Sequence, residues 1–150
     1  FYSRCIEALK GQNLDVIISC GNAVNREELG ELSDNIQVFP CVDQLDILAK
    51  ADVFLTHCGM NSVSESLYMA TPMVLYPKTN EQRAVARRVR EIGAGLELQE
   101  DSAVGIRAAV REILSAPAYA KAAQDCAEDF RSCGGAAEAA DFIENAPHIL

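Results

Sequence analysis

A regular alternation of short apolar runs and amphipathic stretches is the feature that most constrains the fold of this chain. Strand patterns occupy residues 14–20, 35–40, 51–58, 72–77 and 95–99. The run at 14–20 is continuously apolar, as in parallel sheets covered on both faces, and the short run at 95–99 is expected at an edge. Helical patterns precede or separate them at residues 1–10, 25–32, 43–50, 61–70 and 81–93. Connections this short predict an α/β fold with a right-handed, doubly wound parallel sheet.

The alternation ends after residue 101, and only helical patterns follow. Ile106, Val110 and Ile113 form one stripe within residues 102–115, and Pro117 suits the first turn of the next helix. The 150 residues predict a single domain with C-terminal helices. Domains of this class usually open with a strand, whereas the first element here is a helix. Either the sheet has one strand fewer, or the chain is part of a longer protein.

Composition excludes several classes of function. The net charge is −9, and the only basic stretch is RAVARRVR at residues 83–90, which argues against a nucleic-acid partner. No apolar run approaches the ~20 residues of a membrane-spanning helix, and the opening residues do not resemble a signal peptide. We therefore expect a cytoplasmic protein. Its six scattered cysteines are expected to be reduced and mostly buried, and with two histidines a zinc site is not expected.

The stretch from Phe54 to Val74 places polar residues at the junction of a strand and a helix. His57 and Gly59 end the strand, Asn61 and Ser62 open the helix, and Glu65 follows one turn later. Free N–H groups and a partial positive charge make a helix start suitable for a phosphate. A carboxylate one turn deeper suits vicinal ribose hydroxyls. Each residue alone has an ordinary explanation as a helix cap or core residue, but the combination predicts a nucleoside diphosphate site.

Three motifs in order carry a family resemblance. THCGMNSVSES at residues 56–66, with DQLDIL at 43–48 and NEQ at 80–82, resembles the donor-binding region of UDP-dependent glycosyltransferases of the GT-B fold. The likeness is to the macrolide and plant secondary-product glycosyltransferases, family GT1. It is strong over residues 35–98 and rests on element order elsewhere. It implies the Rossmann-like, donor-binding C-terminal half of a two-domain enzyme.

The resemblance implies a role for each matching residue. The donor diphosphate would contact His57, Gly59, Asn61 and Ser62, and the ribose would contact Glu65 and Gln44. The backbone of Val42 would meet the uracil edge, with Cys41 at the position of the base-stacking residue. The sugar hydroxyls would contact Glu81 and Gln82, although an acid near a helix start is also ordinary helix chemistry.

The sequence departs from the family pattern at three positions. Cys41 stands where the family usually has tryptophan or another aromatic residue, which weakens the expectation of a standard uracil clamp. Asp43 replaces a proline and is expected to cap the following helix. Met60 stands where plant members carry tryptophan.

The resemblance also implies what lies outside the 150 residues. The family's general base and acceptor pocket belong to an N-terminal domain, so no catalytic base is expected here, and His148 is interpreted as a surface residue. The expected function is to bind a UDP-sugar for inverting transfer of a hexose to a small-molecule or lipid hydroxyl, without a metal or other cofactor. Peripheral membrane contact is expected only with a lipid acceptor. Two alternatives remain: a non-catalytic donor-binding subunit that needs a separate acceptor-domain partner, and a GT-B nucleotide-sugar epimerase.

Overall fold

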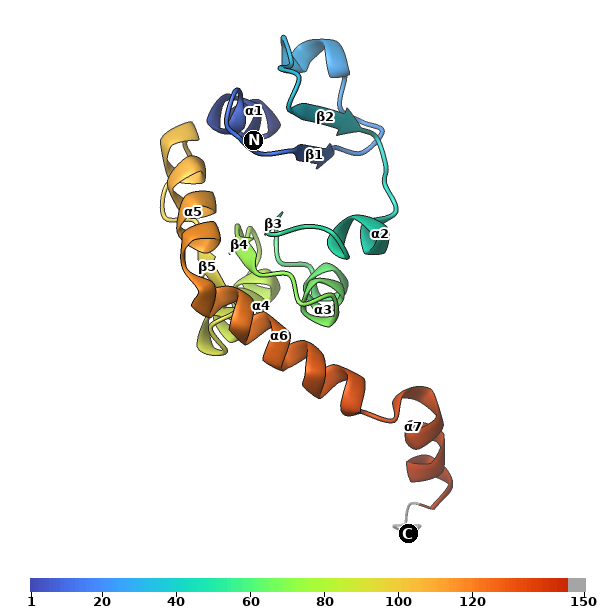
Figure 1. Cartoon of the computed structure of the whole chain (residues 1–150). Coiled ribbons are helices and arrows are strands. Elements are labelled where there is room, and N and C mark those ends of the chain that lie inside the picture. The colour runs from blue at the N-terminus through green and yellow to red at the C-terminus, as the bar shows by residue number, and fades with distance from the viewer. Residues whose placement is uncertain (146–150) are drawn as a thin grey trace.

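The computed structural model describes residues 1–145, and it confirms the predicted α/β class (Figure 1). His148 lies outside the described residues. The helices and strands, in chain order, are α1 (Tyr2–Leu9), β1 (Val16–Ser19), the 3-10 helix η1 (Arg26–Leu29), β2 (Ile36–Phe39), α2 (Gln44–Leu48), β3 (Phe54–Thr56), α3 (Met60–Tyr68), β4 (Met73–Leu75), α4 (Asn80–Glu91), β5 (Gly95–Glu97), α5 (Ala103–Ser115), α6 (Pro117–Ser132) and α7 (Gly135–Glu144).

The strands form two separate parallel sheets. β1 pairs with β2, with Val16 opposite Ile36 and Ser19 opposite Phe39. β3, β4 and β5 form the second sheet in that order, with Phe54 opposite Met73 and Met73 opposite Gly95. β5 is therefore an edge strand, as its short sequence run indicates. All described strand pairs are parallel because each strand is followed by a helix that returns the chain to the starting edge.

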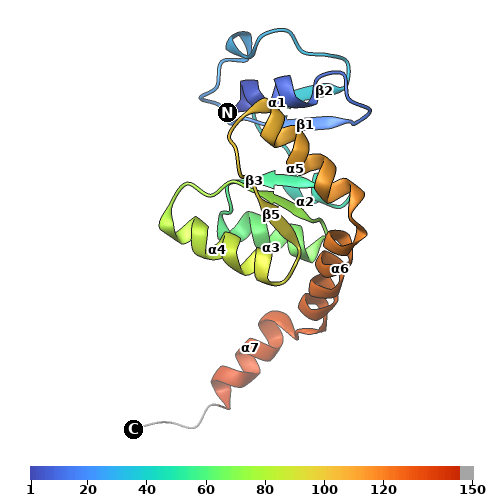
Figure 2. The same cartoon turned by 90° about the vertical axis from the view of Figure 1, so that its left-hand side faces the viewer.

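The three-stranded sheet is covered on both faces. Its central strand, β4, has Met73, Val74 and Leu75 completely buried. Val74 belongs to a core formed with α1 and α5, whereas Met73 and Leu75 belong to a second core formed with α3, α4 and α6. Figures 1 and 2 show the helices on the two sides of the sheet. This layering keeps the site-bearing junction between β3 and α3 on a rigid base.

The two-stranded sheet is covered on one face only. Ile18, Ile36 and Val38 are buried in the core with α1 and α5. On the opposite face Ile17 is 42% exposed and Phe39 is 37% exposed. The apolar run at residues 14–20 predicted cover on both faces, and this prediction is wrong because no described helix packs on that second face.

Several element boundaries differ from the sequence predictions. The helix predicted at residues 25–32 is only the short 3-10 turn η1, and β3 and β4 are shorter than their apolar runs. The sequence favours Asn80 as the cap of the helix at residues 81–93, and this prediction is wrong. The cap of α4 is Thr79, whose hydroxyl accepts from the Gln82 N–H, and Asn80 is the first helical residue. Asp43 caps α2 as predicted, and its carboxylate accepts from the N–H groups of Leu45 and Asp46.

The last helix stands apart from the domain. α6 leads away from the sheets, and α7 follows at its far end (Figures 1 and 2). α7 has no buried residue, and its Phe142 and Ile143 are 76% and 74% exposed. No described helix is both long and apolar enough to cross a membrane.

The six cysteines are free thiols. Cys5 and Cys58 are buried, and burial raises the pKa of each thiol to about 11. Cys20 and Cys126 are half-buried, whereas Cys41 and Cys133 are exposed. The expectation of mostly buried thiols is wrong for Cys41 and Cys133, because both follow elements that end at the surface.

Candidate functional site

The predicted diphosphate residues lie where β3 ends and α3 begins. Between them Cys58 has a φ of 69°, a left-handed conformation that is uncommon for a residue other than glycine. Its N–H donates to the Thr56 hydroxyl at 3.2 Å, and its side chain is fully buried. This buried turn brings the exposed His57 next to the helix start. Strained backbone held in place by a packed core is typical of functional sites.

The first turn of α3 offers backbone donors. Its N-cap is Gly59, which has no side chain to accept from them, so α3 begins without a side-chain cap. The N–H groups of Met60, Asn61 and Ser62 precede the first backbone bond of the helix, which runs from the Val63 N–H to the Gly59 carbonyl. Asn61 is exposed and Ser62 half-buried. The arrangement is that of a helix start open to an anion.

Gly59 lies directly beneath the side chain of His57. A Cβ on this residue would lie 2.9 Å from His57 Nε2, well inside contact distance. The backbone of Gly59 has a φ of −62°, which any residue adopts, so only the imidazole excludes a side chain there. The His57 ring therefore lies over the helix start, and a larger residue at 59 would displace it.

Gln44 joins the two helices of the site. Its side-chain amide donates to Ser62 Oγ at 3.3 Å and to Glu65 Oε2 at 2.5 Å, so the first residue of α2 contacts the first two turns of α3. The resemblance assigned Gln44 and Glu65 to the same ribose, and the structure places them in direct contact. Glu65 is half-buried, and this bond fixes the direction of its carboxylate.

The predicted base-binding residues follow β2. Cys41 is exposed and Val42 half-buried, in the segment that connects β2 to the Asp43 cap of α2. The Cys41 thiol is 3.8 Å from the Val42 carbonyl oxygen. The segment thus approaches the same edge as Gln44, but the residue at the stacking position is a small thiol without a ring.

The predicted sugar-binding residues begin α4. Glu81 is exposed, whereas Gln82 belongs to a capping box. The Gln82 side-chain oxygen accepts from the N–H groups of Lys78 at 2.7 Å and Thr79 at 3.1 Å. Its amide NH2 group is the part that remains to meet a sugar hydroxyl. The described contacts do not join this helix start to the Gln44–Glu65 pair.

A second cluster at the same edge was not predicted. Phe1 stacks on Tyr76 with ring centroids 4.5 Å apart, and Lys78 Nζ lies 3.4 Å from the Tyr76 centroid. The Tyr76 hydroxyl donates to Asp101, and Arg4 donates to both Asp101 oxygens at 2.8 and 2.7 Å. Tyr76 directly follows β4, so its strand-end position was a usable signal. The partners at residues 4 and 101 are too far apart in sequence to be predicted together.

The Asp101 carboxylate is held in its charged form by this cluster. The Tyr76 hydroxyl and the Arg4 guanidinium lower the pKa of Asp101 below its ordinary value, although partial loss of hydration opposes them. The same contact raises the pKa of Arg4. Both groups are solvent-exposed, so the pair is screened by water.

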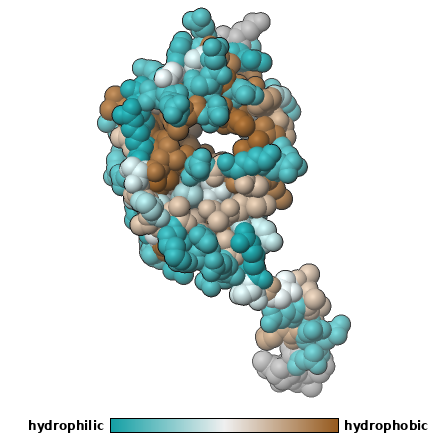
Figure 3. Space-filling model, viewed as in Figure 1, coloured by the Kyte–Doolittle hydropathy of each residue, from teal (hydrophilic) through white to brown (hydrophobic). Residues whose placement is uncertain are grey.

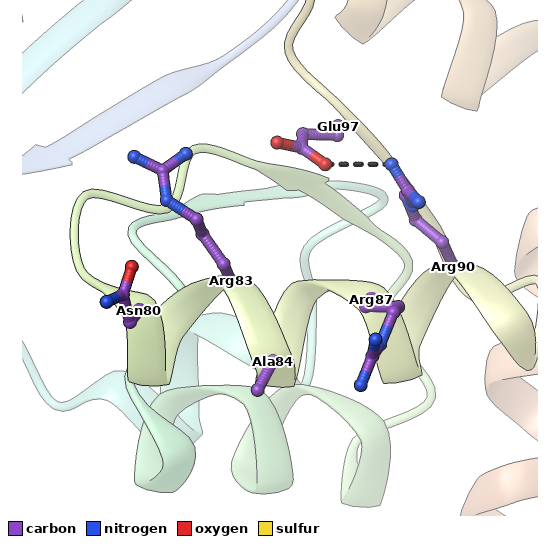
Figure 4. A pocket seen from close by; sticks show the side chains of 6 residues that line it. All are labelled: Asn80, Arg83, Ala84, Arg87, Arg90 and Glu97. Carbon is purple, nitrogen blue, oxygen red and sulfur yellow. Dashed lines mark hydrogen bonds and ion pairs between the residues drawn. The ribbon is translucent and has the colours of Figure 1, made fainter.

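Basic side chains gather along α4. A shallow hollow along α4 is lined by Asn80, Arg83, Ala84, Arg87, Arg90 and Glu97, and Arg90 donates to Glu97 at 2.8 Å (Figure 4). None of the predicted donor-binding residues lines it. Among the described residues, no group of three His, Cys, Asp or Glu side chains is placed to hold a metal ion.

Comparison with known proteins connects this site to a family. Residues 4–145 match the family described as erythromycin biosynthesis protein CIII-like, C-terminal domain. The chain is 39% identical over 146 residues to NDP-glycosyltransferase YjiC of Bacillus licheniformis, covering 96% of this chain and 37% of that protein. It is 34% identical over 149 residues to the oleandomycin glycosyltransferase of Streptomyces antibioticus, covering 96% of this chain and 34% of that protein.

Solved structures agree. The glycotransferase of kitacinnamycin superposes with a TM-score of 0.88 at 36% identity, over 95% of this chain and 38% of that one. The calicheamicin glycosyltransferase CalG4 superposes with a TM-score of 0.87 at 28% identity, over 97% of this chain and 39% of that one. The chain thus spans little more than a third of each relative. It belongs to the EryCIII-like C-terminal domain family, the C-terminal domains of GT1 glycosyltransferases with the GT-B fold.

Proposed function

We propose that this domain binds the UDP-sugar donor of an inverting glycosyltransferase that transfers a hexose to an acceptor hydroxyl. It would be the C-terminal half of a two-domain enzyme, and the acceptor pocket and general base would belong to an N-terminal domain. The names of the relatives support sugar transfer in general. The six free thiols are compatible with the reducing cytoplasm, where we place the protein.

The observation that carries the proposal is the contact of Gln44 with Ser62 and Glu65 at the start of α3. A carboxylate with a fixed direction can accept from two vicinal hydroxyls. The open N-terminal turn of α3 lies one turn away and can accept the diphosphate. Ribose and diphosphate are directly joined in every nucleoside diphosphate sugar, so one ligand would reach both ends of the site.

In the proposed reaction, this domain binds and stabilises the leaving group, the nucleoside diphosphate. The acceptor hydroxyl attacks the anomeric carbon as the bond to the diphosphate breaks, and negative charge grows on the departing phosphate oxygen. The helix start and a His57 N–H would stabilise that charge, with Glu81 and the Gln82 amide holding the sugar. Because the domain supplies no acceptor base in this proposal, it binds donor without transferring sugar on its own.

Calorimetric titration of UDP into the full-length protein tests the site. We expect Glu65→Ala and Ser62→Ala each to weaken binding about tenfold or more, because each removes a hydrogen-bonding group from the ligand or from Gln44. Glu91→Ala is the matched control, since Glu91 is an exposed acid at the far end of α4. Unchanged UDP affinity in both site variants would contradict the proposal.

Gly59→Ala is the sharper variant. Its methyl group would displace His57 while leaving the Glu65 carboxylate and the core unchanged. We expect it to lower UDP affinity more than uridine affinity, because uridine lacks the diphosphate, and to lower the unfolding temperature only slightly, because alanine is a poorer N-cap than glycine. Equal losses for UDP and uridine would place His57 away from the phosphates.

Calorimetric titration also tests which nucleotide base the site prefers. Cys41 offers no ring for stacking, so we expect the discrimination of UDP from dTDP to be weak. Replacing it with an aromatic residue, Cys41→Trp, should strengthen binding of both nucleotides.

Activity of the full-length protein separates the two alternative functions, an epimerase and a non-catalytic donor-binding subunit. Conversion of a UDP-sugar without an acceptor would indicate an epimerase. Transfer only after addition of a separate protein would indicate a donor-binding subunit.

A further inference from the structure

The helix α4 is positively charged, whereas the chain as a whole is strongly acidic. It carries four arginines and two glutamates, so its net charge is +2 in a chain of −9. Three of the arginines, Arg83, Arg87 and Arg90, are spaced by four and three residues and therefore share one face of the helix. This arginine face lines the shallow hollow along α4 (Figure 4). We propose that the arginine face docks an acidic amphipathic helix of a partner protein.

The stability of α4 does not account for Arg83. Arg83 is the fourth residue of the helix, near the positive end of the helix dipole, where a cation is unfavourable. Arg87 follows at i+4, and like charges at this spacing destabilise a helix. No described carboxylate lies within ion-pair distance of the Arg83 guanidinium. Because this placement is unfavourable within the folded chain, it indicates that Arg83 serves to bind another molecule.

The acids beside the other arginines neutralise little of their charge. Arg87 and Arg88 share one carboxylate, that of Glu91, at 3.9 and 3.4 Å, and their side chains are 71% and 73% exposed. Water screens such pairs, so each contributes little. Arg88 and Arg90 lie in the last turn, where the helix dipole favours a cation, so these two have an ordinary explanation. The complete arginine face, which begins at Arg83, does not.

The hollow combines charge with a small apolar surface. The exposed Ala84 lies between Arg83 and Arg87 along the helix, and its short side chain lets another molecule approach α4 closely. The aliphatic stems of the arginines add apolar area beside this methyl group. At the far end, Arg90 donates to Glu97 at 2.8 Å, which fixes the direction of its guanidinium. A partner with both apolar and acidic side chains matches this surface.

The spacing of the arginines favours a helix as the occupant. Neighbouring residues on one helix face are about 5–6 Å apart, and Arg83 and Arg90 lie about 10 Å apart along the axis. Carboxylates at i, i+4 and i+7 of a second helix repeat these distances, so three acids can meet three arginines. The planar guanidinium pairs with a carboxylate through two hydrogen bonds, and α4 carries arginine without any lysine.

Other occupants fit these observations less well. A small anion in a shallow hollow would stay largely in water, whereas small-molecule sites enclose most of their ligand. An anionic membrane would favour large exposed apolar side chains beside the basic ones, and α4 exposes none. A nucleic acid is disfavoured by the net charge of −9. The charge and the spacing of the arginine face therefore favour an acidic helix.

Titration with synthetic helices tests the proposal. The probe is an alanine-based helical peptide of about 20 residues that carries glutamate at i, i+4 and i+7. A peptide with glutamine at the same three positions is the control. We expect only the glutamate peptide to bind the full-length protein and to shift the NMR amide signals of Arg83, Ala84 and Arg87. Equal binding of the two peptides, or shifts confined to other elements, would overturn the proposal.

A double variant identifies the arginines responsible. Arg83→Gln combined with Arg87→Gln removes two guanidinium groups and keeps good helix formers at both positions. We expect it to weaken binding of the glutamate peptide about tenfold or more and to leave the UDP affinity unchanged, so the result does not depend on the proposed donor site. Arg26→Gln, which removes an exposed arginine of η1, is the matched control. Unchanged peptide affinity in the double variant would contradict the docking site.

The same double variant separates the other possible occupants. Tripolyphosphate and phosphatidylserine vesicles serve as probes of a small anion and of a membrane. Weaker binding of both than of the glutamate peptide would support the proposal. Tighter binding of either one, lost in the double variant, would assign the arginine face to that occupant and overturn the proposal.

Discussion

The two sheets of this domain are stabilised in different ways. The three-stranded sheet has a central strand with no exposed residue and helices on both faces. The two-stranded sheet alternates buried and exposed residues, and polar contacts at its amino-terminal end hold it to α1. The predicted diphosphate residues and Glu65 follow β3 of the three-stranded sheet. Gln44 and the predicted base-binding residues follow β2 of the two-stranded sheet. The diphosphate end of the predicted site therefore lies on the better-packed of the two sheets, which suits a site that requires fixed geometry.

Truncation of an apolar side chain should lower the free energy of unfolding much more in the three-stranded sheet than in the two-stranded sheet. Leu75→Ala empties a fully buried position, and we expect it to lower the free energy of unfolding by about 3 kcal/mol. Ile17→Ala removes a side chain that is 42% exposed, and we expect less than about 1 kcal/mol. Urea unfolding followed by circular dichroism gives both values. Equal losses would show that the second face of β1 is covered in solution.

Asn35 holds the start of the two-stranded sheet to the end of α1 by side-chain hydrogen bonds. Its amide donates to the carbonyls of Leu9 and Leu14 at 3.1 and 2.9 Å, and its oxygen accepts from the Gly11 N–H at 3.1 Å. We expect Asn35→Ala to cost about 2 kcal/mol, because several backbone groups lose a partner. Amide exchange should accelerate in β1 and β2 and not in β4. The exposed Asn13→Ala is the control, and uniform acceleration would mean that the two sheets unfold as one unit.

Thr71 tests the connection between the two regions. Its buried hydroxyl donates to the Leu48 carbonyl at the end of α2, and its own carbonyl accepts from the Ser66 hydroxyl in α3. Thr71→Val keeps the shape but leaves the Leu48 carbonyl without this donor, so we expect a loss of about 1–2 kcal/mol in thermal unfolding. Thr71→Ser keeps the hydroxyl and should recover most of the hydrogen-bond contribution. An unchanged unfolding temperature in Thr71→Val would contradict this role of the hydroxyl.

The smallest expected effect is that of the exposed Arg4–Asp101 pair, which holds α1 to the segment before α5. Because the folded pKa of Asp101 is lowered, its stabilising contribution is complete above the ordinary carboxyl pKa and is lost as the pH falls through the lowered value. The unfolding temperatures of the native protein and Asp101→Asn should therefore differ at pH ~7 and converge below pH ~4. A difference that persists in acid would have another origin.

The features of the fold that the sequence predicted correctly are those set by residues close together in the chain. The apolar runs located all five strands within a few residues, because strand periodicity depends on neighbours in sequence. The Asp43 cap was predicted for the same reason. Gly93, the last residue of the helical pattern at 81–93, has a positive φ of 78°, as a glycine that ends a helix commonly has. The helix predicted at residues 25–32 is wrong because this short segment has too little apolar surface to bury.

The sequence by itself therefore determined the α/β alternation, the strand-to-helix junction at residues 54–68 and the residue types at that junction. Only the tertiary structure decided that Gln44 reaches Glu65, that the His57 ring lies over Gly59, and that apolar side chains border an opening in the domain (Figure 3). The physical reason is the separation in sequence over which each kind of interaction acts. Caps and periodicity act within a few residues, whereas these contacts depend on how separate elements pack, and no local pattern encodes the distance between them.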